Sequence, residues 1–285
     1  MPSTIGSCAP GYGEAVSDDI LLVRTEGRIR TLTLNRPQSR NALSRALCDA
    51  TFNALAEADT DDDVDVVILT GADPVFCAGV DLKELGGSAN LDGGEAKLGP
   101  PHQPSASTTQ LGDSPQWPTL TKPVIGAING AAVTGGLELA LSCDILIASE
   151  QARFADTHTR VGILPGWGLT VRLPQRVGVG LARRMSLTGD YLSAADALRA
   201  GLVTEVVPHA DLLPAARKTA AAIVGNNQDA VRALLGTYHR IDEAQTAAGL
   251  WIEAEASRRW LRQVSGADVA ANREAVLNRG RAQVR

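Results

Sequence analysis

Apolar and polar positions near the start of the chain alternate as they do in β-strands. Leu32 and Leu34 alternate with polar neighbours, and a shorter apolar run precedes the turn residue Gly27. Because strands that flank a tight turn usually pair with each other, residues 20–24 and 28–35 predict a β-hairpin.

Helical spacing follows the hairpin. Apolar residues recur every three or four positions up to Ala58, and Ser44 stands just before them, where an N-cap is expected. Residues 44–58 therefore predict a helix. Later apolar runs are too short for helices and predict strands. Buried strands are expected at 64–69, 123–128 and 144–148, and a short edge strand at 152–155.

The last third of the chain has a different pattern, because strand-like runs become rare after Ala182, with one exception at 202–207. Strands and helices followed by a helical tail predict an α/β core over residues 19–208 and a C-terminal helical region over 209–285. Residues 1–18 lack the pattern of a signal peptide and are expected to form a flexible leader. The tail predicts helices at 211–224, 229–238, 243–264 and 267–278.

One long segment, residues 86–118, interrupts the core pattern. It is rich in Gly, Pro and Ser, which predicts a surface loop rather than a core element. Such a loop either helps to shape a binding pocket, as a lid does, or is a linker without function.

Composition excludes several classes of partner. The net charge is −5, so the chain lacks the basic field that nucleic acid or an anionic membrane attracts. No apolar run approaches the length of a membrane span. The four cysteines lie far apart, without the spacing of a zinc site or a disulfide framework, which favours a reducing cytoplasm.

Two turns of small residues give the strongest chemical signal. Each separates a predicted strand from a helix start, one at 76–82 and one at 130–136. If the turns meet, the backbone N–H groups of Val80 and Gly135 can hold one carbonyl oxygen as an oxyanion hole. Glu138 then stands near that carbonyl as an acid or base; the alternative is an ordinary carboxylate that favours the helix dipole.

Other motifs argue against nucleotide chemistry. Gly130 and Gly135 have the spacing of a phosphate-binding loop, but Gly136 and Leu137 replace its Lys and Ser or Thr. The PGWG segment at 165–168 lacks the third glycine of a dinucleotide fingerprint, and the chain has no GxSxG elbow.

A family resemblance rests on two segments, FCAGVDLKEL at 76–85 and KPVIGAINGAAVTGGLELALSCDILIAS at 122–149. Together they resemble the crotonase superfamily, also called the enoyl-CoA hydratase/isomerase family. Weaker matches extend the resemblance over roughly residues 20–265. It implies an α/β spiral of ββα units, a helical trimerisation region, and a homotrimer or a dimer of trimers.

The resemblance also implies the substrate and several roles. Substrates are acyl-CoA thioesters, and no separate cofactor is expected because coenzyme A is part of the substrate. Val80 and Gly135 match the two oxyanion donors of the family, in agreement with the reading from the turns. Lys83 lies either near the CoA moiety or in solvent on a helix. The residues expected along the substrate are Ala78, Asp81, Leu82, Lys83 and Trp167.

The sequence departs from the family pattern at one catalytic position. Hydratases of the family hold a water between two glutamates; Glu138 matches the first, but His158 stands in place of the second. Imidazole can still act as acid or base, with Asp156 to orient it. The missing carboxylate argues against isomerisation. Trp167 either shapes the acyl pocket or is ordinary packing, and Arg279 is the nearest match to a C-terminal basic residue that reaches CoA in relatives.

The sequence thus predicts an enoyl-CoA hydratase, a lyase acting on 2-trans-enoyl-CoA, with Glu138 and His158 as catalytic residues. Two alternatives stay open. One is another crotonase reaction, such as thioester hydrolysis or decarboxylation. The other is an acyl-CoA-binding protein without catalysis, which the change to His158 motivates.

Overall fold

The computed structural model describes residues 19–81, 84 and 117–284. The expected leader 1–18, Leu82, Lys83 and all but the last two residues of the segment 86–118 lie outside these described residues.

A six-stranded sheet forms the centre of the fold, in the order β1-β2-β3-β4-β6-β9. The β1–β2 pair is antiparallel, which confirms the predicted hairpin, and the other four pairings are parallel. The carboxyl ends of the parallel strands therefore lie at the same end of the sheet. The strands are Leu21–Glu26 (β1), Ile29–Leu34 (β2), Val66–Gly71 (β3), Val124–Ile128 (β4), Ile145–Ser149 (β6) and Glu205–Val207 (β9).

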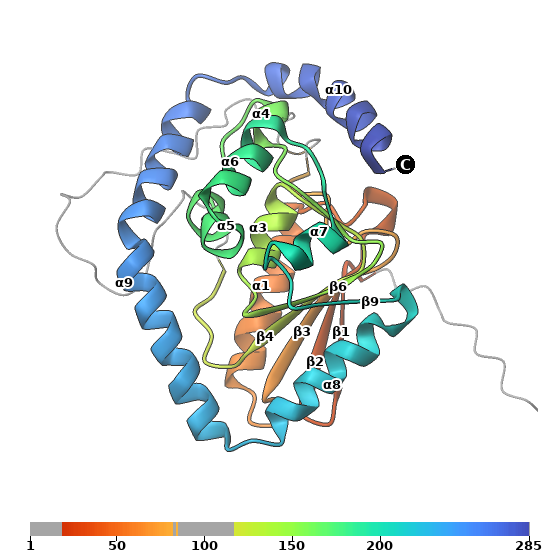
Figure 1. The fold of residues 1–285 in the computed structure, drawn as a ribbon, viewed down its shortest axis with the longest axis vertical. Coiled ribbons are helices and arrows are strands. Elements are labelled where there is room, and N and C mark those ends of the chain that lie inside the picture. The colour runs from red at the N-terminus through yellow and green to blue at the C-terminus, as the bar shows by residue number, and fades with distance from the viewer. Residues whose placement is uncertain (1–18, 82–83, 85–116, 285) are drawn as a thin grey trace, which may run out of the picture.

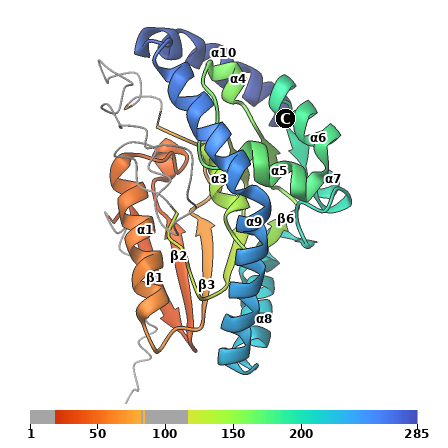
Figure 2. The same cartoon turned by 90° about the vertical axis from the view of Figure 1, so that its left-hand side faces the viewer.

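The inner strands are buried on both faces, which explains why they read as continuous apolar runs. In β3, Val67 and Leu69 point into the core under helix α1 (Arg45–Thr60), whereas Val66 and Ile68 pack against helix α8 (Leu212–Val224). Figure 2 shows α1 and α8 on opposite sides of the sheet. The predicted N-cap is confirmed, because the Ser44 side chain accepts a hydrogen bond from the Leu47 N–H.

A second sheet of three strands corrects two sequence expectations and adds one strand that was not expected. Ala131–Val133 is a strand (β5) rather than part of a turn. Arg153–Ala155 (β7) is the central strand rather than an edge, since β5 pairs with it in parallel and Leu192–Ser193 (β8) pairs with it antiparallel. Small residues hid β5, and β8 has two residues, too few for a pattern. The second sheet begins with β5, just after the carboxyl end of β4, and so adjoins that end of the first sheet.

Short helices connect the two sheets and surround the second one. They were expected only in part, because most are shorter than the window in which helical periodicity can be read. They are η1 (Pro37–Ser39), α3 (Gly135–Leu141), α4 (His158–Val161), α5 (Leu169–Val177), α6 (Val179–Thr188), α7 (Ala194–Arg199) and η2 (His209–Asp211).

The C-terminal region is helical as predicted, but its division differs. A single helix, α9 (Gln228–Leu261), replaces the two expected at 229–238 and 243–264. The stretch between them, residues 239–242, continues the helix, and His239 within it lies 3.1 Å from Asp144. Figure 1 shows α9 along one side of the molecule, with α10 (Gly266–Val284) turning back over α4. Since α8 packs on the sheet, the helices that stand off the sheet are α9 and α10.

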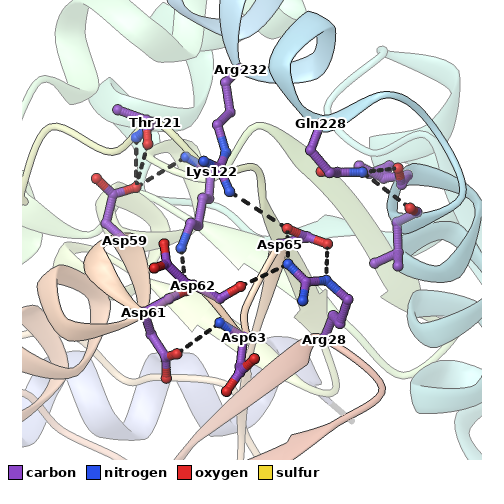
Figure 3. Close-up of polar contacts among 12 residues, drawn as sticks. Arg28, Asp59, Asp61, Asp62, Asp63, Asp65, Thr121, Lys122, Gln228 and Arg232 are labelled. Atoms are coloured by element: carbon purple, nitrogen blue, oxygen red, sulfur yellow. Dashed lines mark hydrogen bonds and ion pairs between the residues drawn. The ribbon is translucent and has the colours of Figure 1, made fainter.

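Charged residues fasten the start of α9 to the amino end of the sheet (Figure 3). The buried carboxylate of Asp65 accepts from Arg28 at 2.9 Å and lies 3.5 Å from Arg232 of α9. Nearby, the buried Lys122 ammonium donates to the carbonyl oxygens of Ala58 and Asp61, at 2.8 and 2.6 Å. Helix α9 is thus held at its beginning by residues from distant parts of the chain.

Candidate active site

The two small-residue turns meet, which is the condition that the oxyanion-hole hypothesis sets. Cys77 pairs with β5, because its N–H donates to Ala131 at 3.0 Å and its carbonyl accepts from Val133 at 3.0 Å. On the other side Val80 forms a parallel bridge with Leu43. The turn that contains Val80 therefore lies between the segment before α1 and the segment before α3.

Glycine is required where the turns touch. A Cβ on Gly136 would lie 2.2 Å from the Cys77 carbonyl oxygen, far inside any real contact. Gly79 has φ +90°, a conformation that favours glycine, and a Cβ there would lie 2.8 Å from the Val133 carbonyl oxygen. The close approach thus depends on the absence of these side chains.

The backbones of Val80 and Gly135 lie next to each other where the turns meet. In the Val80 bridge, the hydrogen bonds to Leu43 are made by the Gly79 carbonyl and the Asp81 N–H, so the Val80 N–H faces away from Leu43. Gly135 is the first residue of α3, where an amide has no partner within the helix. A Cβ on Gly135 would lie 3.5 Å from the Val80 nitrogen, so the two residues are in contact.

Glu138 lies in the first turn of α3 and is buried, with 3% of its surface exposed. Its Oε1 atom accepts hydrogen bonds from the backbone N–H groups of Trp167 at 2.8 Å and Gly166 at 3.3 Å. A buried carboxylate is costly unless it is paired. The glycine-rich loop before α5 therefore supplies the donors that hold Glu138 in place.

His158 stands beside Glu138, again as predicted. Its Nε2 atom lies 3.5 Å from Glu138 Oε2, and its Nδ1 atom lies 2.6 Å from Asp156 Oδ1. The Asp156 carboxylate also accepts from the His158 backbone N–H at 3.1 Å. Three buried groups thus form a row, with the imidazole between two carboxylates.

The row keeps the imidazole charged. Burial by itself lowers the pKa of His158, but the hydrogen bonds and charges of Asp156 and Glu138 outweigh it and raise the pKa to about 9. Burial likewise raises the pKa of Asp156 by itself, but its bonds to His158 and the His158 charge hold that pKa below the usual value. His158 is therefore an imidazolium at neutral pH, with its Nε2 atom 3.5 Å from Glu138 Oε2.

Of the other four predicted substrate residues before Trp167, the structure describes Ala78 and Asp81. Ala78 lies in the first turn, where its N–H donates to the Arg40 carbonyl at 3.1 Å. Asp81 is buried and paired with Arg36 at 3.1 Å, so it fastens the turn to the chain before α1. Leu82 and Lys83 lie outside the described residues.

Trp167 contributes to the site in two ways. Its half-buried indole ring packs edge-on against Phe52, with ring centroids 6.1 Å apart. Its backbone N–H holds Glu138, as described above, and this second contact could not be anticipated from the side chain. Arg279, the nearest match to a CoA-binding basic residue, lies 3.5 Å from Asp190.

One residue of the neighbourhood was missed by sequence analysis. Glu253 of α9 is buried and accepts hydrogen bonds from the N–H groups of Gly168 and Thr170, each at 2.6 Å. Burial raises the pKa of Glu253, against the effect of the Thr170 hydrogen bond. An acid in a long polar helix carries no sequence signal that separates it from its solvated neighbours.

In residues 19–81, 84 and 117–284, no helix has the length and apolar character needed to cross a bilayer. The same part of the chain contains no cluster of three or more His, Cys, Asp or Glu side chains arranged to hold a metal ion.

Comparisons with known proteins point to one family. The enoyl-CoA hydratase/isomerase family model matches residues 24–265. A solved enoyl-CoA hydratase from Mycobacterium avium is 71% identical, with a TM-score of 0.74, over 85% of this chain and 97% of that one. The enoyl-CoA hydratase structure from Mycobacterium tuberculosis H37Rv is 69% identical, with the same TM-score and coverage. A probable peroxisomal enoyl-CoA hydratase of Arabidopsis thaliana is 42% identical over 76% of this chain and 78% of its own length.

Proposed function

The chain belongs to the enoyl-CoA hydratase/isomerase family, and we propose that it hydrates 2-trans-enoyl-CoA thioesters. The observation that carries this proposal is the buried row of Glu138, His158 and Asp156 beside the two turns. The row supplies one base and one acid within reach of the same small molecule, as addition of water to a double bond requires.

The amides of Val80 and Gly135 are proposed to hold the thioester oxygen. As the nucleophile adds to the β carbon, negative charge moves onto that oxygen, and fixed N–H donors stabilise it. Each such donor contributes about 3 kcal/mol in the transition state, because it is in place before the charge develops. The polarised enoyl group then accepts a nucleophile at the β carbon and a proton at the α carbon.

Glu138 and His158 are proposed to divide the proton transfers. Glu138 removes a proton from water while the water oxygen bonds to the β carbon. The Nε2–H of the His158 imidazolium gives a proton to the α carbon. Glu138 Oε2 and His158 Nε2 are 3.5 Å apart. A water at about 2.8 Å from each of these atoms therefore lies to the side of the line that joins them. Afterwards the proton on Glu138 passes to His158 and restores both groups.

A histidine suits the acid role for a physical reason. A second glutamate would have to be protonated to donate, whereas an imidazolium with a pKa of about 9 carries its proton at neutral pH. This argues for catalysis over the alternative of a binding protein that has lost half of its acid–base pair. Asp156 supports the role because it holds the charged ring through Nδ1.

The proposal also covers the cofactor, the oligomeric state and the compartment of the enzyme. The steps above use only side chains and backbone amides, so no cofactor is called for beyond the coenzyme A of the substrate. The exposed apolar side chains of α9, such as Leu234, Tyr238 and Ile252, are in keeping with a homotrimer or a dimer of trimers. The three described cysteines are free thiols, which is in keeping with the cytoplasm.

The test is loss of enoyl absorbance when the purified protein is mixed with crotonyl-CoA. Glu138→Gln is expected to lower kcat by about 10² to 10⁴, because it removes the base but keeps the size of the side chain. Glu150→Gln, at an exposed turn, is the matched control and keeps wild-type turnover. Tight acyl-CoA binding without turnover would favour the binding protein instead, and release of free CoA would favour thioester hydrolysis.

A further inference from the structure

Helix α9 contacts the loop that holds Glu138 through three polar side chains. Glu253 accepts from Gly168 and Thr170 as described, Ser257 Oγ donates to the Leu164 carbonyl at 3.3 Å, and Trp260 Nε1 donates to the Gly162 carbonyl at 2.9 Å. Together these contacts cover the loop from Gly162 to the first turn of α5.

The three side chains share one face of the helix. Their spacing is i, i+4 and i+7, which places them in one row. Glu253 and Ser257 are buried in a helix that is otherwise largely exposed. The long exposed helix therefore has one buried polar face, and that face lies on the loop.

Two buried carboxylates hold neighbouring amides of this loop and of the first turn of α5. The N–H groups of Gly166 and Trp167 donate to Glu138, and those of Gly168 and Thr170 donate to Glu253. Glu253 also accepts from the Thr170 hydroxyl. Moving the Gly168 peptide away from Glu253 would therefore move the Trp167 peptide that orients Glu138.

The loop needs such support because of its composition. Glycines leave the backbone free to adopt many conformations, and Gly168 has φ +97°, which favours glycine. A catalytic group must be held within about 0.5 Å of its working position. A loop that contains Gly162, Gly166 and Gly168 does not provide that precision without an external anchor.

We propose that Glu253 is a positioning residue for the reaction: by holding Gly168 and Thr170, it fixes the amides that orient Glu138. This inference rests on the hydratase function proposed above. The competing explanation is that Glu253 only caps the start of α5 and so contributes to stability, with no effect on the Glu138 carboxylate.

The main experiment uses Glu253→Gln. The amide keeps the size of the side chain but can accept only through oxygen, so its NH₂ group meets one of the backbone N–H donors without an acceptor. On crotonyl-CoA, kcat is expected to fall about ten- to a hundredfold. KM, and the Kd for the unreactive saturated butyryl-CoA, are expected to stay unchanged, because neither depends on the base.

The matched control is Glu255→Gln, which removes an exposed carboxylate two residues away on the same helix and should behave as wild type. Thr170→Val gives a second test if Glu253→Gln does not fold. Thr170→Val removes only the hydroxyl donor and should lower kcat, but by less than Glu253→Gln does. Thr170→Ser keeps the donor and should have the kcat of the wild type.

Unchanged kcat in folded Glu253→Gln overturns the proposal. A fall in kcat accompanied by an equal loss of butyryl-CoA binding also overturns it, because it marks general structural damage. Hydrogen exchange separates this proposal from the proposed function. Faster exchange in residues 162–170 of the variant, with unchanged exchange in residues 228–245, supports the anchor even if the wild type has no hydratase turnover; unchanged exchange in both contradicts it.

Discussion

His158 differs from an isolated histidine because two carboxylates face its two ring nitrogens. Its pKa rises from about 6.5 in an unfolded chain to about 9. The charged ring therefore stabilises the fold below about pH 6.5, and this contribution is lost as the pH rises through about 9. If His158 is the acid of the reaction, the rate is lost over the same range in which the ring loses its proton.

Asp156→Asn tests this account. The amide oxygen still accepts from Nδ1–H, but the negative charge is removed, so the pKa of His158 should fall by about one unit or more. We expect the basic limb of the kcat/KM profile to move to lower pH by the same amount. Profiles of wild type and variant on crotonyl-CoA provide the measurement, and identical basic limbs would contradict the role of Asp156.

Trp167 separates the contribution of a side chain from that of its backbone. Trp167→Ala keeps the N–H that holds Glu138 but removes the ring that packs on Phe52. We expect little change in kcat on crotonyl-CoA, a lower KM for longer enoyl-CoAs, and about 2 kcal/mol less stability, since the ring is only half buried. Leu187→Ala, which shortens an exposed side chain on α6, should change none of these. A large loss of kcat would show that the ring itself positions the base.

At the scale of elements, the junction between the two turns determines whether the amides of Val80 and Gly135 can act together. Gly136→Ala would place a methyl group against the Cys77 carbonyl and push the start of α3 away. We expect about 1 to 3 kcal/mol less stability and a fall in kcat of more than tenfold. Thermal unfolding and turnover on crotonyl-CoA are the measurements.

Gly180→Ala is the matched control for that substitution. Gly180 lies in α6, and a Cβ there would meet nothing within 4 Å. Because alanine restricts the unfolded chain, this variant should be more stable by about 0.4 to 1 kcal/mol, with wild-type kcat. Equal effects of the two alanines would show that the junction tolerates a side chain.

At the scale of the whole molecule, α9 joins the amino end of the sheet to the active-site loop. Near its start, Arg232 of α9 pairs with Asp65, which also accepts from Arg28 (Figure 3). Glu253 lies farther along the same helix. The hydrogen bond from Arg28 holds the pKa of Asp65 below its usual range, so this stabilisation is present above about pH 4 and lost as the pH falls through the lower, folded-state value.

Asp65→Asn should lower the free energy of unfolding by about 2 kcal/mol at pH 7, because two guanidinium groups lose a charged partner. The difference between wild type and variant should shrink as the pH falls through the folded-state pKa of Asp65. Urea unfolding at several pH values measures it. A difference that is constant with pH would mean that the charge of Asp65 is not what stabilises this end of the sheet.

The sequence by itself determined the parts of this protein that local patterns encode. Alternating apolar residues predicted the hairpin, and a cap and helical spacing predicted α1. Small residues marked the two segments that meet, whereas the role of the Val80 and Gly135 amides stays a prediction. The family motifs predicted Glu138 and pointed to His158. Each of these signals lies within a short stretch of chain, where spacing and side-chain size are enough.

Only the tertiary structure decided how distant residues meet. It made a strand of the small residues 131–133, because Cys77 and Arg153–Ala155 lie on either side of them. It joined two expected helices into α9 and brought Glu253 to a loop 85 residues away. Such contacts depend on packing between segments far apart in the chain, and a polar residue on a polar helix gives no sign of its partner until the fold places it.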